Sequence, residues 1–168
     1  CLDIGSGISG IFRIYHWIQY DKFDSARLTL SDNDPFVLTV LRSAAQYLQI
    51  TTLAVMELDL FEVQEIIKRF DRVTVCDVFH HIDEERVPEA VQNAVRLVKD
   101  RGALQIYDSH DTKQDKRSSW LDELTPLLQE EGGLIQTAET VPGYCGQGFR
   151  IKANNFSGNR GRNRGQRP

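Results

Sequence analysis

Short apolar runs alternate with longer amphipathic segments along most of the chain. Runs with strand character lie at residues 1–4, 27–31, 53–58, 72–78 and 103–107. Segments with apolar residues at helical spacing lie at 9–19, 35–48, 61–70, 84–98 and 118–130. Two later runs, 134–140 and 148–152, predict an antiparallel pair at the sheet edge. The alternation predicts an α/β fold, with a mostly parallel sheet between two layers of helices.

Local signals mark several element boundaries. Asp34 can cap a helix whose first turn holds Pro35. Gly102, in the turn 99–102, is the expected end of the helix before it. Residues 154–168 are rich in Gly, Asn and Arg, which predicts a disordered tail after a folded domain over 1–153.

Composition and charge narrow the class of protein. The 168 residues are enough for one domain with a single core. Four of the 20 basic residues fall in 156–168, so the rest carries 16 bases against 24 acids and is a poor general surface for nucleic acid. Three widely spaced cysteines show no zinc spacing and indicate a reducing compartment, which we take as the cytoplasm. No apolar run is long enough to predict a membrane span.

The glycine-rich turn at the start of the chain, residues 1–10, carries the first chemical signal. A short strand runs into Gly5 and Gly7, and Asp3 lies two residues before the first of them. Glycines at a strand–helix turn let the backbone approach a ligand closely. A carboxylate at this place suits a ligand with positive charge. S-adenosylmethionine, which carries an ammonium and a sulfonium, fits better than a dinucleotide pyrophosphate.

Four acids lie at the ends of the first four predicted strands. The carboxyl ends of parallel strands share one edge of a sheet, and ligands bind in the crevice beyond them. A nucleoside offers hydroxyl donors on its ribose and an amine donor on its adenine. Asp32 is the acid that we expect at the ribose. The four are Asp3, Asp32, Asp59 and Asp77.

A dinucleotide site is the rival interpretation of the same glycines. Gly5, Gly7 and Gly10 have its G-x-G-x-x-G spacing, and Asp32 lies near the distance expected for its ribose acid. Asp3, however, would lie near the pyrophosphate, and Asp59 would have no group to bind. The last antiparallel pair is also not part of the simple repeat. The cationic nucleoside is therefore the better prediction.

Five segments in order resemble the motifs of class I S-adenosylmethionine-dependent methyltransferases. They lie at 1–10, 28–35, 57–60, 70–82 and 96–104. The resemblance implies a three-layer Rossmann-like fold, whose seven-stranded sheet ends in a reversed C-terminal hairpin. It implies S-adenosylmethionine as cofactor, bound by Asp3, Gly5, Ser6, Gly7, Asp32, Asn33, Asp59, Leu60 and Asp77. Ser9 and the turn 99–102 depart from the family pattern, and neither departure excludes cofactor binding.

The acceptor of the methyl group is less well indicated. His80 and His81 follow strand four, where the resemblance places the reactive methyl, and are the candidate catalytic residues, as base or orienting group. The alternative is that one ring packs under the next helix and the other caps it. A magnesium site at Asp77, Asp108 and His110 is a further interpretation, but its spacing is unspecific, and we expect no metal.

A small-molecule acceptor is the leading prediction. The arginine-rich end, 157–167, could bind RNA, but residues 77–80 lack the paired prolines of nucleic-acid amino-methylating enzymes. A non-catalytic domain of the same fold is the third alternative. The family often covers its acceptor pocket with an N-terminal segment. Because the sequence begins inside the first predicted strand, we expect that cover to be missing here. The sequence does not indicate an oligomeric state.

Overall fold

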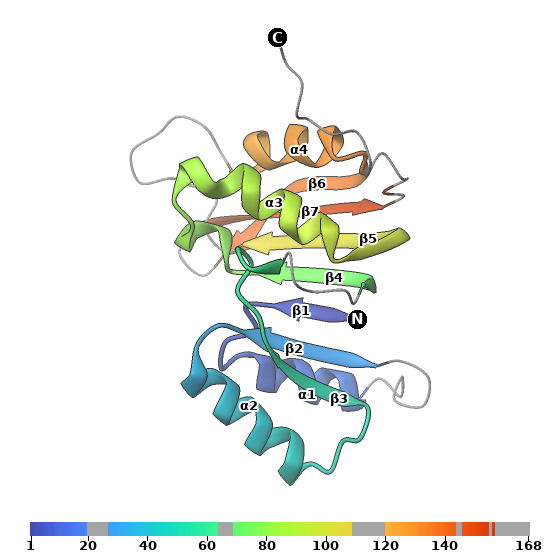
Figure 1. The fold of residues 1–168 in the computed structure, drawn as a ribbon. Helices are drawn as coiled ribbons and strands as arrows, with labels where there is room; N and C mark the ends of the chain where they lie inside the picture. Colours follow the sequence, from blue (N-terminus) through green and yellow to red (C-terminus); the bar gives the residue numbers. More distant parts are fainter. Residues whose placement is uncertain (20–26, 64–68, 109–119, 144–145, 155, 157–168) are drawn as a thin grey trace.

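A seven-stranded sheet forms the centre of the computed structural model, which describes residues 1–19, 27–63, 69–108, 120–143, 146–154 and 156. The strand order is β3-β2-β1-β4-β5-β7-β6 (Figure 1), and among the described strands β7 alone runs in the opposite direction to the others. The strands are β1 (Leu2–Ile4), β2 (Leu28–Asp32), β3 (Leu53–Glu57), β4 (Phe70–Cys76), β5 (Val98–Asp108), β6 (Leu134–Gly143) and β7 (Gly146–Asn154). The predicted mostly parallel sheet with a reversed C-terminal hairpin is confirmed.

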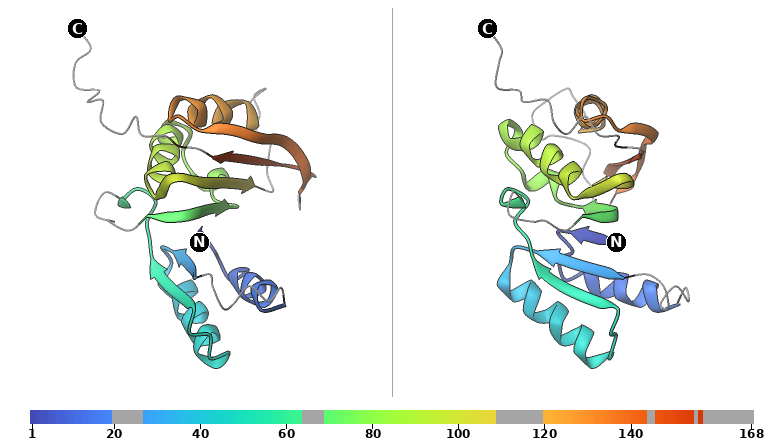
Figure 2. Two further views of the ribbon diagram at one scale, coloured as in Figure 1. Left: turned by 90° about the vertical axis from the view of Figure 1, so that its right-hand side faces the viewer. Right: turned by 45° about the vertical axis from the view of Figure 1, so that its right-hand side comes forward.

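Helices pack in pairs against the two halves of the sheet. The α-helices are α1 (Gly10–Gln19), α2 (Pro35–Tyr47), α3 (Val87–Arg96) and α4 (Trp120–Glu130). Two 3₁₀ turns, η2 (Phe79–His81) and η3 (Glu84–Arg86), precede α3. Helices α1 and α2 contact each other beside β2 and β3, whereas α3 and α4 contact each other beside β5, β6 and β7 (Figures 1 and 2).

The sheet register assigns these pairs to opposite faces. Leu30 of β2 is paired with Asp3, so it shares a face with Asp3, whereas Leu2 and Ile4 point to the other face. Leu30 packs in a core with residues of α1 and α2. Leu2 and Ile4 pack in the larger core with α3 and α4. The fold therefore has three layers, as predicted.

The boundary between α3 and β5 differs from the prediction. Helix α3 ends at Arg96, and β5 begins at Val98, so Gly102 lies inside the strand and does not end the helix. A Cβ at Gly102 would lie 2.9 Å from the carbonyl oxygens of Asp71 and Lys99, which explains the glycine by close backbone approach. The Lys99 ammonium also hydrogen-bonds Asp71 across the strands and lowers the pKa of that carboxyl group.

The segment after β3 also departs from the prediction. A helix was expected over 61–70, but residues 61 and 62 form a turn and a bend, Val63 is in a 3₁₀ conformation, and Phe70 already opens β4. Residues 64–68 of that expected helix lie outside the described part. The helix expected from Glu84 starts as the 3₁₀ turn η3 and becomes α-helical at Val87, with Pro88 in its first turn.

Two end signals are confirmed, and the core extends past its predicted boundary. The Asp34 carboxylate accepts the Phe36 N–H at 2.8 Å and caps α2, with Pro35 at its first position. At the C-terminal end, Asn154 belongs to β7 and Phe156 is 1% exposed in the core. The domain therefore reaches Phe156 and does not stop at 153. Residues 155 and 157–168 of the predicted tail lie outside the described part.

Candidate active site

The loops after β1 and β4 meet at the point where the strand order reverses, because these two strands are neighbours in the sheet (Figure 1). Gly5 has a positive φ of 64° there. A Cβ on Gly5 would lie 2.2 Å from Cγ2 of Val78, the second residue after β4. Only glycine fits both the conformation and the space. In open α/β sheets, this reversal point is where ligands bind.

Buried hydrogen bonds hold the glycine turn against β2. The Ser6 hydroxyl lies 2.8 Å from Asp3 Oδ2 and accepts the Ser31 N–H at 3.2 Å, while the Ser6 N–H donates to the Ser31 carbonyl at 2.9 Å. Asp3 is 2% exposed and Ser6 is fully buried. The Ser6 carbonyl also accepts from the Ser9 hydroxyl at 3.0 Å, so all three polar groups of Ser6 are used within the protein. Ser6 therefore supports the loop, and its predicted contact with the cofactor stays a prediction.

Asp32 links the glycine turn to the turn after β2. Its Oδ2 accepts the Gly7 N–H at 2.9 Å, and its Oδ1 accepts the Asp34 N–H at 3.0 Å. Its backbone carbonyl also accepts the Leu58 N–H at 3.0 Å, which ties the end of β3 to the same place. Each carboxylate oxygen keeps a second lone pair for a ligand donor. Asn33, next to it, is exposed.

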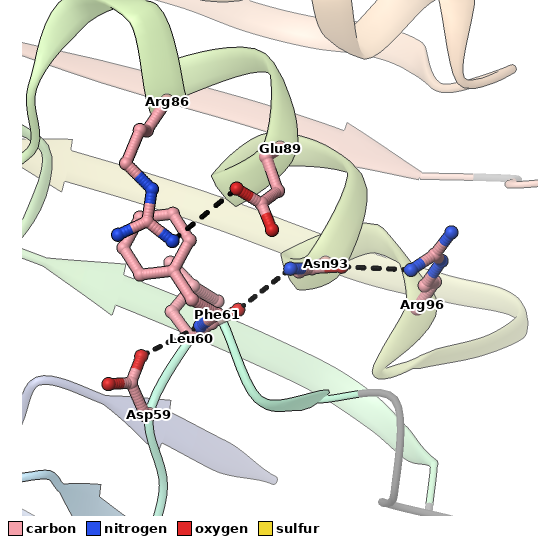
Figure 3. A network of polar contacts seen from close by, with 7 residues as sticks. All are labelled: Asp59, Leu60, Phe61, Arg86, Glu89, Asn93 and Arg96. Carbon is pink, nitrogen blue, oxygen red and sulfur yellow. Dashed lines mark hydrogen bonds and ion pairs between the residues drawn. The ribbon is translucent and has the colours of Figure 1, made fainter.

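The turn after β3 is held by the start and middle of α3 (Figure 3). Asp59 Oδ1 accepts the Phe61 N–H at 2.8 Å. The Leu60 carbonyl accepts from the side-chain amide of Asn93 at 3.0 Å, and Asn93 is 1% exposed. The Arg86 guanidinium lies 3.4 Å from the centroid of the Phe61 ring. These contacts fix where Asp59 and Leu60, both predicted cofactor residues, present their groups.

A second group of polar residues gathers where β4 and β5 end. Asp77 has a positive φ of 53°, and its N–H donates to the Tyr107 carbonyl at 2.9 Å. His80 Nδ1 lies 2.8 Å from Asp108 Oδ1, and Asp108 is fully buried. The His81 ring is exposed and lies 3.8 Å from the His80 ring, centroid to centroid. Asp77 therefore lies with the histidines.

A metal ion is the alternative use of this second group. Ligand atoms of Asp77, His80 and Asp108 lie within 4.8 Å of one another. The direct contact between His80 and Asp108 is, however, that of a hydrogen-bonded pair. His110, the third residue of the magnesium interpretation, lies outside the described part. We treat the group as an imidazole–carboxylate pair with a neighbouring carboxylate, not as a metal site.

Residues 1–102 match the family described as the methyltransferase domain. The chain belongs to that family. Comparison with curated proteins gave no significant match. The methyltransferase domain matches a S-adenosylmethionine-dependent methyltransferase from Aquifex aeolicus with a TM-score of 0.70 and 16% identity, over 92% of this chain and 80% of that one. It also matches the magnesium protoporphyrin IX methyltransferase from Synechocystis PCC 6803 with bound S-adenosylmethionine. The TM-score is 0.70 and the sequence identity 15%, over 92% of this chain and 68% of that one.

A [4+2]-cyclase, SpnF, is also similar, with a TM-score of 0.70 and 13% identity over 92% of this chain and 73% of the cyclase. At these identities, the structural matches establish the fold of the methyltransferase domain. The class I methyltransferase assignment is confirmed, and with it the methyl-transfer activity of the family and S-adenosylmethionine as its cofactor. In the described residues, no helix has the length and apolar character needed to cross a membrane.

Sequence reasoning missed two residues of this site. Asn93 looked like an ordinary polar position on a helix, and nothing local in the sequence indicates that it holds Leu60. From the sequence, Asp108 was a candidate only as a metal ligand. Its place at the end of β5, in line with the other strand-end acids, was a usable signal for a partner of His80.

Proposed function

We propose that this methyltransferase domain moves a methyl group from S-adenosylmethionine to a small-molecule acceptor by in-line displacement. The observation that carries the proposal is the position of Asp32. Its carboxylate accepts backbone N–H groups of both the glycine turn and the turn after β2, so it lies between the two segments that a nucleoside would contact. A carboxylate so placed can accept both ribose hydroxyls.

The remaining cofactor roles follow from the order of the loops. Asp3 of β1 and Gly5 and Gly7 of the turn after it would face the methionine part, where the ammonium group needs a negative partner. Asn33 after β2, with Asp59 and Leu60 after β3, would enclose the adenine, whose amine is a donor for Asp59. Asp77 lies on the other side of the reversal point, near the reacting methyl. The contacts of Asp59 and Leu60 with their neighbours support this arrangement.

The acceptor would enter from the β4 side, next to His80 and His81. The sulfonium is already a good leaving group, so alignment of the two reacting atoms supplies most of the rate. Proximity and orientation can contribute about 7–11 kcal/mol. The anchored glycine turn and the anchored start of η2 support such a reaction, because both would hold reacting groups in place.

A labelled-methyl assay tests the proposal. The domain is incubated with methyl-labelled S-adenosylmethionine and pools of small phenols, amines and thiols, and both S-adenosylhomocysteine and labelled product are measured. We expect demethylated cofactor to form only when an acceptor is present. If the domain binds the cofactor but transfers no methyl group in any pool, the result would instead support a non-catalytic domain. The similarity to a [4+2]-cyclase is a reason to test this alternative. The assay uses reducing buffer, since we place the domain in the cytoplasm.

RNA is the second acceptor to be tested, because of the arginines in 157–168. Total RNA added to the same assay should take no label if the acceptor is a small molecule. The acidic balance of the rest of the chain supports that expectation, since phosphates are repelled by it.

A further inference from the structure

We propose that His80, oriented by Asp108, is the general base of this domain, and that its acceptor is therefore a phenol or a similarly acidic hydroxyl compound. The inference deepens the proposed function and rests on it. It selects one of two adjacent histidines, gives Asp108 a positioning role, and names the substrate class.

The buried Asp108 carboxylate contacts His80 at two groups, the ring Nδ1 and the backbone N–H. Its Nδ1 lies 2.8 Å from Oδ1 and 3.0 Å from Oδ2 of Asp108, and its backbone N–H donates to the same Oδ2 at 3.3 Å. The Asp108 side chain is completely buried, while 19% of the His80 side chain is exposed. Asp108 thus fixes both the ring and the first turn that carries it, and one edge of the ring remains reachable.

The pair also sets which ring nitrogen carries the proton. An Asp carboxylate has only acceptor oxygens, so Nδ1 must donate, and Nε2 of a neutral ring is left as an acceptor. A nitrogen that can accept a proton is the form that a general base needs. Within the described part of the chain, titratable groups beside the ring include Asp77, from the turn after β4, and His81 of η2, whose ring is tilted by 45° to that of His80.

The place of His80 agrees with this role. Val78, two residues earlier, lies against Gly5 of the glycine turn, and Phe79 is fully buried, so the backbone leading to His80 is anchored at the reversal point. The His80 ring is thereby held at the β4 side of the reversal point, where the methyl group would be transferred. The His81 side chain, in contrast, is exposed.

A general base at His80 implies that the methyl acceptor loses a proton during the reaction. As the acceptor oxygen forms its bond to the methyl carbon, the carbon–sulfur bond breaks and its electron pair stays on sulfur. The hydroxyl proton passes to Nε2 of His80, and the resulting imidazolium faces the Asp108 carboxylate. A general base removes the proton of a phenol, whose hydroxyl has a pKa of about 10, far more readily than that of an aliphatic alcohol, which is a much weaker acid. A thiolate or tertiary amine would need no base.

The test compares two phenols in the wild type and three variants. Unsubstituted phenol needs a base, whereas 4-nitrophenol is already ionised near neutral pH. We expect His80→Gln to lower the rate with phenol about 100-fold or more and the rate with 4-nitrophenol less than about 10-fold. Asp108→Asn should lower the rate with phenol about 10–100-fold. Asp83→Asn, which removes an exposed acid three residues after His80, is the control and should change neither rate.

A second readout does not depend on turnover. Imidazole ¹⁵N shifts of the wild-type domain should show a protonated Nδ1 and an unprotonated Nε2 at His80, and Asp108→Asn should redistribute the proton. Equal losses with both phenols in His80→Gln, or a proton on Nε2 in the wild type, would overturn the proposal. So would turnover of thiols or amines alone, or a rate lost in chelator and restored by Mg²⁺. Failure to bind S-adenosylmethionine would instead overturn the proposed function.

Discussion

At the scale of single residues, the site depends on a few positions where only one residue type fits. Gly5 combines a positive φ with a space closed by Val78, and Asp32 combines two backbone acceptor contacts with near-complete burial. These residues were predicted from the sequence because their chemistry is local: a glycine turn after a strand and an acid after the next strand. The supporting role of Ser6 was not predicted, because its contacts with Asp3 and Ser31 are formed only in the fold.

Gly5→Ala tests the closeness of the two loops. The added methyl group would lie 2.2 Å from Val78 Cγ2 and would also strain a residue at φ 64°. We expect a loss of about 2–4 kcal/mol in the free energy of unfolding, measured by urea denaturation. Gly7→Ala, with a similar φ of 56° but no atom nearer than 3.8 Å, is the control for strain alone and should cost less.

Adding Val78→Ala to Gly5→Ala should restore part of that loss, because it removes the clashing methyl groups. Equal losses for Gly5→Ala and Gly7→Ala, with no rescue by Val78→Ala, would show that the close approach does not decide the identity of residue 5.

At the scale of elements, the site is built by contacts between segments that are distant in sequence. Helix α3 fixes the turn after β3 through Asn93, and the end of β5 fixes the start of η2 through Asp108. Alternating apolar and polar positions predicted α3 and β5 but not their common boundary. A bulge between Phe70 and Arg72 of β4 shifts the pairing, and Val98 joins the strand before Gly102. Such register shifts have no local signal.

Asn93→Leu tests whether α3 holds the turn after β3. The substitution keeps the volume similar but leaves the buried Leu60 carbonyl without its donor, which should cost about 1–3 kcal/mol of stability. We also expect weaker binding of S-adenosylhomocysteine, measured by calorimetry. Arg96→Met is the control, since Arg96 contacts Asn93 Oδ1 at 3.0 Å but not Leu60. Comparable effects of the two variants would mean that the bond to Leu60 is not what matters.

At the scale of the whole molecule, alternating strand and helix signals were enough to predict the fold. The parallel order, the two helix layers and the reversed last strand are as expected, because each element's period agrees with its place in the sheet. The sequence placed the C-terminal boundary of the domain before Phe156, because the Gly, Asn and Arg content of residues 154–168 predicts disorder. Phe156 is the apolar residue of this segment that packs in the core. Phe156 packs against Gly133, where a Cβ would lie 2.6 Å from the Phe156 ring.

Phe156→Ala tests whether the core extends this far. Removing a ring that is 1% exposed should cost about 3–5 kcal/mol in the free energy of unfolding. Phe12→Ala on α1, where the side chain is 71% exposed, makes the same chemical change at the surface and should cost little. Thermal unfolding of both variants checks this, and similar midpoints would place Phe156 outside the core.

The central claim is that the carboxylate rim at the ends of β1–β3 binds S-adenosylmethionine, and calorimetry on three proteins tests it most directly. The wild type should bind the cofactor in the micromolar range. Asp32→Asn should weaken binding by about 1.5–3 kcal/mol, roughly 10–150-fold. Glu57→Gln, the same change at the exposed partner of Asp32 on β3, should leave binding unchanged. Equal affinity in a folded Asp32→Asn variant, or no binding by the wild type at saturating cofactor, would contradict the account.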